Sequence, residues 1–277
     1  MALQTTQARH PHTSTAMRSV PDLLPLLYQT EQTPGWSSGM RGITRVLLTR
    51  FVRPANSILE LGCGTGAFTN ELTTLAPAQL VVGVDISKVA LHHAHLQSRQ
   101  PPYFASADLQ ALPFADATFN LVIALDTFDQ KGVDPHIALA ESWRMLRPQG
   151  NLLVRVSAHR WLKSVHDLAF NTDRRFSRAE LSETLQAAGF TLVATTYANT
   201  LLSPPIVLLR LLQQQKILPF RPSLYTAPLL NRLLALMLQA EARWLQKRNL
   251  SFGVSLYAFA QKIDQESMRS KEAVDAN

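Results

Sequence analysis

A short apolar strand that runs directly into a glycine loop is the feature that most constrains this chain. Residues 57–66 read Ser-Ile-Leu-Glu-Leu-Gly-Cys-Gly-Thr-Gly, with glycine at positions 62, 64 and 66. Glycine allows a tight turn and lets a ligand approach the backbone closely. A helix that begins near Ala67 would point its free N–H groups at the same place. The pattern therefore predicts a buried parallel strand, a ligand-binding loop and a helix, in that order.

The residues around this loop indicate the charge of the ligand. Dinucleotide-binding loops have the spacing Gly-x-Gly-x-x-Gly, whereas this loop reads Gly-x-Gly-x-Gly. Glu60 stands just before the first glycine, where a carboxylate would repel a pyrophosphate and attract a cation. A nicotinamide-dependent oxidoreductase remains the enzymatic alternative, but both features favour a cationic ligand.

The next three candidate strands supply the rest of the same site. The second ends in Asp85, where a carboxylate can accept hydrogen bonds from both hydroxyls of a ribose. The third is followed by Asp108, which is placed to meet an adenine amino group. The fourth, residues 119–124, ends beside the remaining part of the ligand. The contacts expected here are Asp85, Ile86, Asp108, Leu109 and Ala124.

These segments resemble, in order, the motifs of class I S-adenosylmethionine-dependent methyltransferases, and most of all the small-molecule and lipid group called type 11. The resemblance covers roughly residues 36–198 and resumes near residue 252. Its motifs are Glu-Leu-Gly-Cys-Gly-Thr-Gly (60–66), Val-Asp-Ile-Ser (84–87), Ala-Asp-Leu (107–109), Leu-Pro-Phe (112–114), Phe-Asn-Leu-Val (119–122) and Leu-Arg-Pro-Gln-Gly (146–150).

The resemblance implies a fold, a cofactor and a reaction. The fold is a Rossmann-like doubly wound seven-stranded α/β sheet, and the cofactor is S-adenosylmethionine as methyl donor. Glu60 and the loop residues Gly62, Cys63, Gly64 and Gly66 would hold its methionine end, Asp85 its ribose and Asp108 its adenine. The acceptor would be a small or lipid-like molecule.

Composition limits the class of protein. With 277 residues, 46% of them hydrophobic and 17% charged, the chain suits one large globular domain. It has no run of 18 apolar residues and no signal-like segment, so we expect a cytoplasmic protein, peripheral to a membrane at most. Cys63 is the only cysteine, which excludes an internal disulfide and a cysteine-based zinc site; no metal site is expected.

The chain divides into a core domain with additions. We expect a disordered tail at 1–20, a helical cap at 21–52, a methyltransferase domain at 53–262 and a frayed tail at 263–277. In the resembled fold the last two strands form a hairpin, but here a helical insertion at 199–250 separates them.

This insertion is both leucine-rich and basic. Between residues 198 and 250 there are seven Lys and Arg residues against one acid, Glu241. Three interpretations stay open: a helical pair packed as core, a lid over a hydrophobic acceptor, or a surface that docks on anionic membrane.

The catalytic residues are less well indicated. Methyl transfer from a sulfonium depends mainly on alignment, and a base is needed only if the acceptor must lose a proton. Asp129, after the fourth strand, and His166, after the fifth, are the candidate bases, although relatives have a Leu-Glu-His-like sequence near position 129. The candidate acceptor contacts are Trp36, Met40, Arg41, Tyr197 and Asn199.

The sequence also bears on two other classes of function. A nucleic-acid substrate is disfavoured because the Asn- or Asp-Pro-Pro-aromatic motif is absent after the fourth strand and the basic helices lack interleaved aromatics. A catalytically silent, cofactor-binding scaffold or regulatory domain stays open, because Asp129, Gln130 and Gln149 depart from the family pattern.

Overall fold

The protein is described by a computed structural model for residues 31, 33, 35–75, 80–97, 102–219 and 227–263. The predicted tail at 1–20, the start of the predicted cap and nearly all of the predicted tail at 263–277 lie outside these residues.

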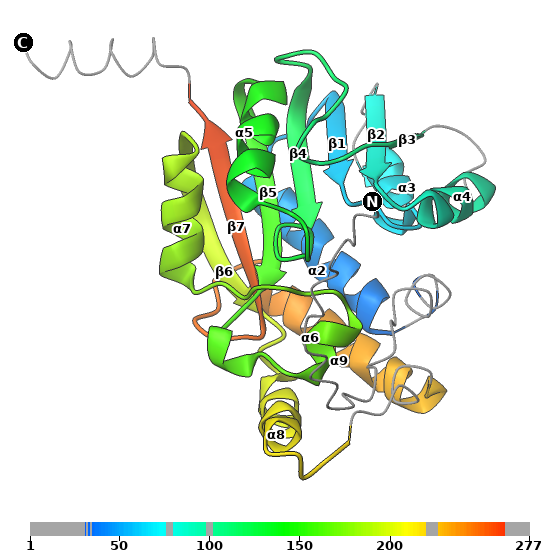
Figure 1. Ribbon diagram of the computed structural model, residues 1–277, viewed down its shortest axis with the longest axis vertical. Coiled ribbons are helices and arrows are strands. Elements are labelled where there is room, and N and C mark those ends of the chain that lie inside the picture. Colours follow the sequence, from blue (N-terminus) through cyan, green and yellow to red (C-terminus); the bar gives the residue numbers. More distant parts are fainter. Residues whose placement is uncertain are drawn as a thin grey trace, which may run out of the picture.

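The described chain forms one seven-stranded sheet in the order β3-β2-β1-β4-β5-β7-β6 (Figure 1). β1 to β5 pair in parallel, whereas β7 inserts antiparallel between β5 and β6. This arrangement confirms the predicted fold class. The strands are β1 (Ser57–Leu61), β2 (Leu80–Asp85), β3 (Tyr103–Ser106), β4 (Phe119–Leu125), β5 (Leu146–Ser157), β6 (Phe190–Ala198) and β7 (Ser255–Lys262).

Helices connect these strands, and their ends follow from local sequence. Asp134 accepts a hydrogen bond from the His136 N–H, with Pro135 in the first turn, and Ser177 and Glu180 form a capping box. The helices are α2 (Trp36–Phe51), α3 (Ala67–Leu75), α4 (Lys88–Gln97), α5 (Pro135–Met145), η1 (Arg160–Leu162), α6 (Val165–Ala169), α7 (Arg178–Ala187), α8 (Ser203–Gln214) and α9 (Pro228–Leu245).

Each face of the sheet has its own hydrophobic core. On one face, side chains of β1, β2, β4, β5 and β7 pack against α5 and α7. On the other, Ile58, Ile123 and Tyr257 pack against α2, α3 and α9. Because successive strand residues point to opposite faces, strands buried on both faces read as nearly continuous apolar runs.

The inserted helices occupy two different places. α9 packs along α2, where Arg50 donates from Nη1 to the Leu245 carbonyl at 2.9 Å, and Gly39 lies so close that a Cβ there would be 2.6 Å from Leu238 Cδ1. α8 instead neighbours α6 and η1 at the lower end of the molecule (Figure 1). α9 is therefore part of the domain's core, as one of the three interpretations of the insertion requires.

Candidate functional site

A cavity of about 730 Å³ opens at the carboxyl ends of the parallel strands, where open α/β sheets bind their ligands. It is bordered by the glycine loop and by residues of α2, α6, α8 and α9. The site residues predicted from sequence that line it are Trp36, Arg41, Glu60, Gly62, Cys63, Gly64, Asp85, Ile86, Asp108, Leu109, His166 and Asn199.

The glycine loop has the backbone conformation that only glycine adopts readily. Gly62, Gly64 and Gly66 have φ values of +67°, +54° and +73°. A Cβ on Gly62 would also lie 2.7 Å from Thr127 Oγ1, so the loop and the end of β4 approach each other closely. Cys63 of the loop is buried beside β2, where a Cβ on Gly83 would lie 2.9 Å from its Sγ, and burial raises the pKa of its thiol, so it acts as a small apolar residue.

Glu60 is a buried carboxyl on the floor of the cavity. It is 3% exposed and accepts a hydrogen bond from the Thr69 hydroxyl of α3. Burial raises the pKa of Glu60 to about 8, although the bond from Thr69 acts in the opposite direction. Without a ligand the group is therefore largely protonated at neutral pH, and a cation beside it would favour its ionised form.

Glu60→Gln should remove a pH dependence of folding. Because the pKa of Glu60 is raised above its ordinary value of 4.5, the folded state holds a proton that the unfolded state has lost between about pH 5 and pH 8. The wild-type free energy of unfolding should fall as pH rises through this range, by at most about 1.4 kcal/mol per pH unit from this group. Urea unfolding of both proteins at pH 5.5, 6.5 and 7.5 measures the difference, and parallel slopes would contradict the assignment.

Asp85 and Asp108 stand at the ends of the next two strands. Asp85 accepts from the Gly64 N–H through Oδ2 at 2.9 Å and from the Ser87 N–H through Oδ1 at 2.8 Å, so it also fixes the loop. Asp108 is exposed and accepts from the Gln110 N–H at 2.9 Å. Three carboxyl groups thus follow one another along the sheet edge, as the sequence predicts.

Some predicted site residues do not border the cavity. Met40 and Ala124 are buried in the two cores, and Gly66 turns the loop against Phe104. Tyr197 stacks on His159 at 5.3 Å between ring centroids. These four residues therefore lie behind the cavity lining, and their contact with a ligand stays a prediction.

The structure places Asp129, one of the two candidate bases, outside the cavity lining. Its side chain is fully buried and does not line the cavity, and Oδ2 accepts from the Ser157 N–H at 2.8 Å. Its carbonyl oxygen accepts from the N–H groups of Asp173 and Arg174. Asp129 therefore holds the loop after β4 against the end of β5.

An ion pair between the end of β4 and β5, with a buried guanidinium and a partly exposed carboxylate, was missed by sequence analysis. Arg155 donates from Nε to Asp126 Oδ1 at 2.9 Å and from Nη2 to Oδ2 at 2.6 Å, and both residues line the cavity. Asp126 has φ +53°, a left-handed conformation that costs an ordinary residue about 1–3 kcal/mol and is common at ligand sites. The signal for this ion pair in the sequence is Arg155, a charged residue inside the otherwise apolar segment 152–157.

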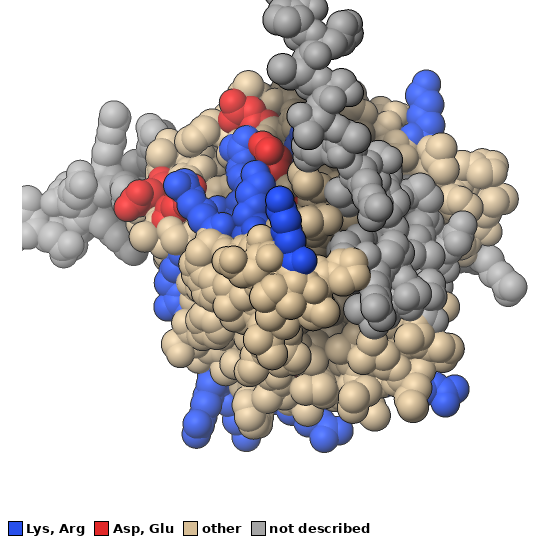
Figure 2. Space-filling model, turned by 60° about the horizontal axis from the view of Figure 1, so that its bottom comes forward, with Lys and Arg blue, Asp and Glu red and all other residues tan. Residues whose placement is uncertain are grey.

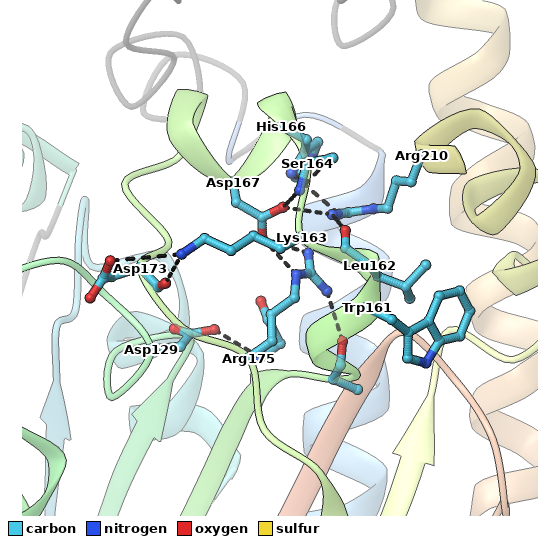
Figure 3. A network of polar contacts seen from close by, with 12 residues as sticks. Asp129, Trp161, Leu162, Lys163, Ser164, His166, Asp167, Asp173, Arg175 and Arg210 are labelled. Atoms are coloured by element: carbon cyan, nitrogen blue, oxygen red, sulfur yellow. Dashed lines mark hydrogen bonds and ion pairs between the residues drawn. The ribbon is translucent and has the colours of Figure 1, made fainter. Parts of the chain in front are cut away.

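A second charged network borders the cavity between α6 and α8 (Figure 3). Asp167, which is 1% exposed, accepts from Arg175 Nε at 2.7 Å and from Arg210 Nη1 at 3.0 Å. Arg210 Nη2 also donates to His166 Nδ1 at 3.3 Å. Burial and both arginines lower the pKa of His166 well below its ordinary value, so the imidazole is neutral at pH 7. Arg210 is therefore a buried site residue and no part of the exposed basic surface.

Asn199 and Glu31 complete the polar lining. Asn199 is fully buried with φ +62°, and its Nδ2 donates to Ser255 Oγ at 2.9 Å. Its Oδ1 has no hydrogen-bond partner among the described residues. Glu31 accepts from the Thr65 hydroxyl beside the glycine loop; sequence analysis assigned it only to the helical cap.

Comparisons with known proteins place this geometry in a family. The model of a methyltransferase domain, Methyltransf_11, matches residues 59–154. A trans-aconitate 2-methyltransferase of Deinococcus radiodurans is 32% identical over 55% of each chain. A malonyl-[acyl-carrier protein] O-methyltransferase of Legionella pneumophila is 44% identical over 24% of each chain. The chain spans between about a quarter and just over half of these relatives.

A solved structure shows the same fold. Phosphoethanolamine N-methyltransferase 2 of Haemonchus contortus, in complex with S-adenosyl-L-methionine, has a TM-score of 0.59 at 17% identity, over 87% of this chain and 57% of that one. The cofactor of the family is S-adenosylmethionine. Residues 59–154 are therefore a methyltransferase domain of the class I S-adenosylmethionine-dependent family, type 11.

Proposed function

We propose that the protein transfers a methyl group from S-adenosylmethionine to a small-molecule or lipid-like acceptor. The observation that carries the proposal is the row of carboxyl groups on Glu60, Asp85 and Asp108, which border one cavity around a glycine loop with left-handed backbone. Carboxylates suit a ligand with an ammonium, ribose hydroxyls and an adenine amino group, and this ligand needs no phosphate site.

Each of these residues receives a role in the proposal. Glu60 and the loop of Gly62 and Gly64 hold the methionine end, Asp85 accepts from the ribose hydroxyls and Asp108 meets the adenine. When bound, the cofactor supplies a methyl group on a sulfonium, which is a good leaving group. The protein's own contribution is to align the acceptor with that methyl group and to exclude water.

The acceptor side of the cavity is more apolar. Leucine and isoleucine side chains of α8 and α9 line it, together with Trp36 of α2, whose ring lies 5.7 Å from the Arg155 guanidinium. We propose that the domain comprises residues 53–262 and that the insertion at 199–250 shapes this side. The names of the relatives, which act on malonyl-acyl-carrier protein and trans-aconitate, support a small acceptor over a nucleic acid. The apolar lining residues are Leu202, Ile206, Leu209, Leu230 and Leu234.

Calorimetric titration of the purified protein with S-adenosylhomocysteine tests the proposal, with NADH as the parallel control. Micromolar binding of S-adenosylhomocysteine without binding of NADH is the expected result, and it would justify an acceptor screen. Binding of NADH alone would favour the oxidoreductase. Cofactor binding without turnover across acceptor classes would favour the silent scaffold.

We also propose that the end of the molecule formed by α8 and α9 docks on anionic membrane. Figure 2 brings this end forward and shows a broad uncharged area with Lys and Arg at its edge. Leu208 of α8 and Leu229 and Trp244 of α9 are exposed, while Glu241, the acid of these helices, is buried. In the described part, no helix has the length and apolarity to cross a bilayer. The exposed cations are Lys216, Arg232, Arg243, Lys247 and Arg248.

Vesicle sedimentation tests this docking. The protein should sediment with vesicles that contain phosphatidylserine, and binding should fade as salt rises from about 0.05 to 0.5 M because the Debye length shortens. Replacing Arg232 and Arg243 by Gln should weaken binding, whereas Arg147→Gln, an exposed arginine on β5, serves as the control. Equal sedimentation with neutral phosphatidylcholine vesicles would contradict the electrostatic account.

A further inference from the structure

Glu31 lines the cavity beside the glycine loop, although it precedes α2 and every strand of the sheet in the chain. We infer that Glu31 is a further cofactor-binding residue, which forms with Glu60 a pair of carboxylates for the ammonium group of the methionine end. The family model matches residues 59–154 and so does not include Glu31. This inference rests on the proposed function, because it adds a residue to the cofactor site of that function.

The first support is the position of Glu31 relative to the loop. Its Oε2 accepts a hydrogen bond from the Thr65 hydroxyl, and a Cβ on Gly64 would lie 3.8 Å from the same oxygen. Glu60 reaches the same cavity from β1, two residues before the first glycine of the loop. A ligand group held at the loop would therefore meet one carboxyl from β1 and one from the segment before α2.

The second support is the way in which Glu31 is fixed. Arg41 of α2 donates from Nη1 to the Glu31 carbonyl at 2.8 Å and from Nε to Glu71 Oε1 at 2.7 Å. Glu71 belongs to α3, the helix that begins directly after the glycine loop. Glu31 is thus tied to α2 through its backbone and to the loop through its side chain. Such fixation from two sides is what a residue that orients a ligand requires.

The third support is the pairing of the charged groups around this pair of carboxyls. The two arginines that influence the pair are each bonded to another acid. Arg41 makes its ion pair with Glu71, and Arg155 makes its ion pair with Asp126. Among the described residues, neither member of the carboxyl pair makes an ion pair. The protein therefore leaves room for a cation that a ligand brings.

The acidity of the two groups agrees with this role. Burial raises the pKa of Glu31, and burial together with the nearby charge of Glu31 raises the pKa of Glu60 to about 8. The site therefore opposes the ionisation of both groups when no cation lies beside them. An ammonium group would favour the ionised form of both and would donate charge-assisted hydrogen bonds to them.

Two ligands that differ in one group test the inference. S-adenosylhomocysteine has the ammonium group, and in its deamino analogue a hydrogen takes the place of this group. Each is titrated by calorimetry at fixed pH and salt. The wild type should bind S-adenosylhomocysteine at least about tenfold tighter than the analogue, the preference expected for charge-assisted hydrogen bonds.

Glu31→Gln should remove most of this preference and leave the affinity for the deamino analogue unchanged. Glutamine keeps an oxygen that can accept from the Thr65 hydroxyl, so the variant loses the charge and retains the contact with the loop. Glu31→Asp, which keeps the charge on a shorter side chain, should retain more of the preference than Glu31→Gln.

Glu183→Gln is the matched control, because Glu183 is an exposed glutamate of α7 outside the cavity. It should bind both ligands as the wild type does, and circular dichroism checks the folding of each variant. Equal losses of affinity for both ligands in Glu31→Gln would show that Glu31 only holds the loop. That result, an unchanged preference in Glu31→Gln, or a wild type without a preference would overturn the inference. A wild type that binds neither ligand would instead refute the proposed function.

Discussion

Asp85→Asn should weaken the binding of S-adenosylhomocysteine by about 1.5–3 kcal/mol, or roughly tenfold to more than a hundredfold in Kd. The two oxygens of Asp85 accept from the N–H groups of Gly64 and Ser87, and the side chain borders the cavity. An amide of the same shape keeps one acceptor oxygen and loses the charge. The variant therefore loses a charged hydrogen bond to the ribose and also loosens the glycine loop. Calorimetry at fixed salt measures the change.

Asp116→Asn is the control for this experiment. Asp116 makes an ion pair with Arg144, its side chain is 77% exposed, and it lies outside the cavity. This variant should bind S-adenosylhomocysteine with the wild-type Kd. If Asp85→Asn also kept the wild-type Kd, the assignment of Asp85 as the residue that binds the ribose hydroxyls would be refuted.

Gly39→Ala should lower the free energy of unfolding by about 1–3 kcal/mol, although alanine is the better helix former. A Cβ at Gly39 would lie 2.6 Å from Leu238 Cδ1 and 2.7 Å from Leu238 Cβ, so α2 and α9 would have to move apart. Urea unfolding measures the loss. The experiment tests whether α9 must stay packed against α2. If α9 were a lid that detaches freely, it could move away from the added methyl group, and the free energy of unfolding would not fall.

The same helix offers the control substitution. Gly42 faces open space, since a Cβ there would have only Arg45 Nη2 near it, at 3.9 Å. Gly42→Ala should therefore stabilise the protein by about 0.5–1 kcal/mol through helix propensity alone. Similar effects of the two substitutions, in either direction, would show that α9 does not constrain α2.

The sequence was most informative where signals were local. The glycine loop and the acids after β2 and β3 each depend on residues close in the chain, and the structure places them where the sequence predicts. The start of β5 is harder to predict. The strand begins at Leu146, which pairs with Phe119, whereas the apolar run in the sequence begins only at residue 152, after the polar Arg-Pro-Gln-Gly segment.

Long-range charge pairs could not be predicted. The roles of Arg155, Arg175 and Arg210 depend on the acidic partners that the fold brings beside them. Arg210, for example, is 43 residues from Asp167 in the chain. In the sequence Arg210 belongs to a basic, leucine-rich helix, which suggested an exposed surface. For a related reason, the position of Asp129 after β4 did not reveal its burial against Ser157.

β7 lies between β5 and β6 in the sheet, although it is synthesised after both of them. Among the strands that the structure describes, β6 pairs only with β7, and β5 has β7 on one side. Residues 190–198 emerge from the ribosome well before residues 255–262, and α8 and α9 are made in between. The nascent chain therefore carries two unpaired strand edges until its last strand arrives. Such edges are templates for aggregation, so the growing chain is most exposed to misassembly while the inserted helices are being synthesised.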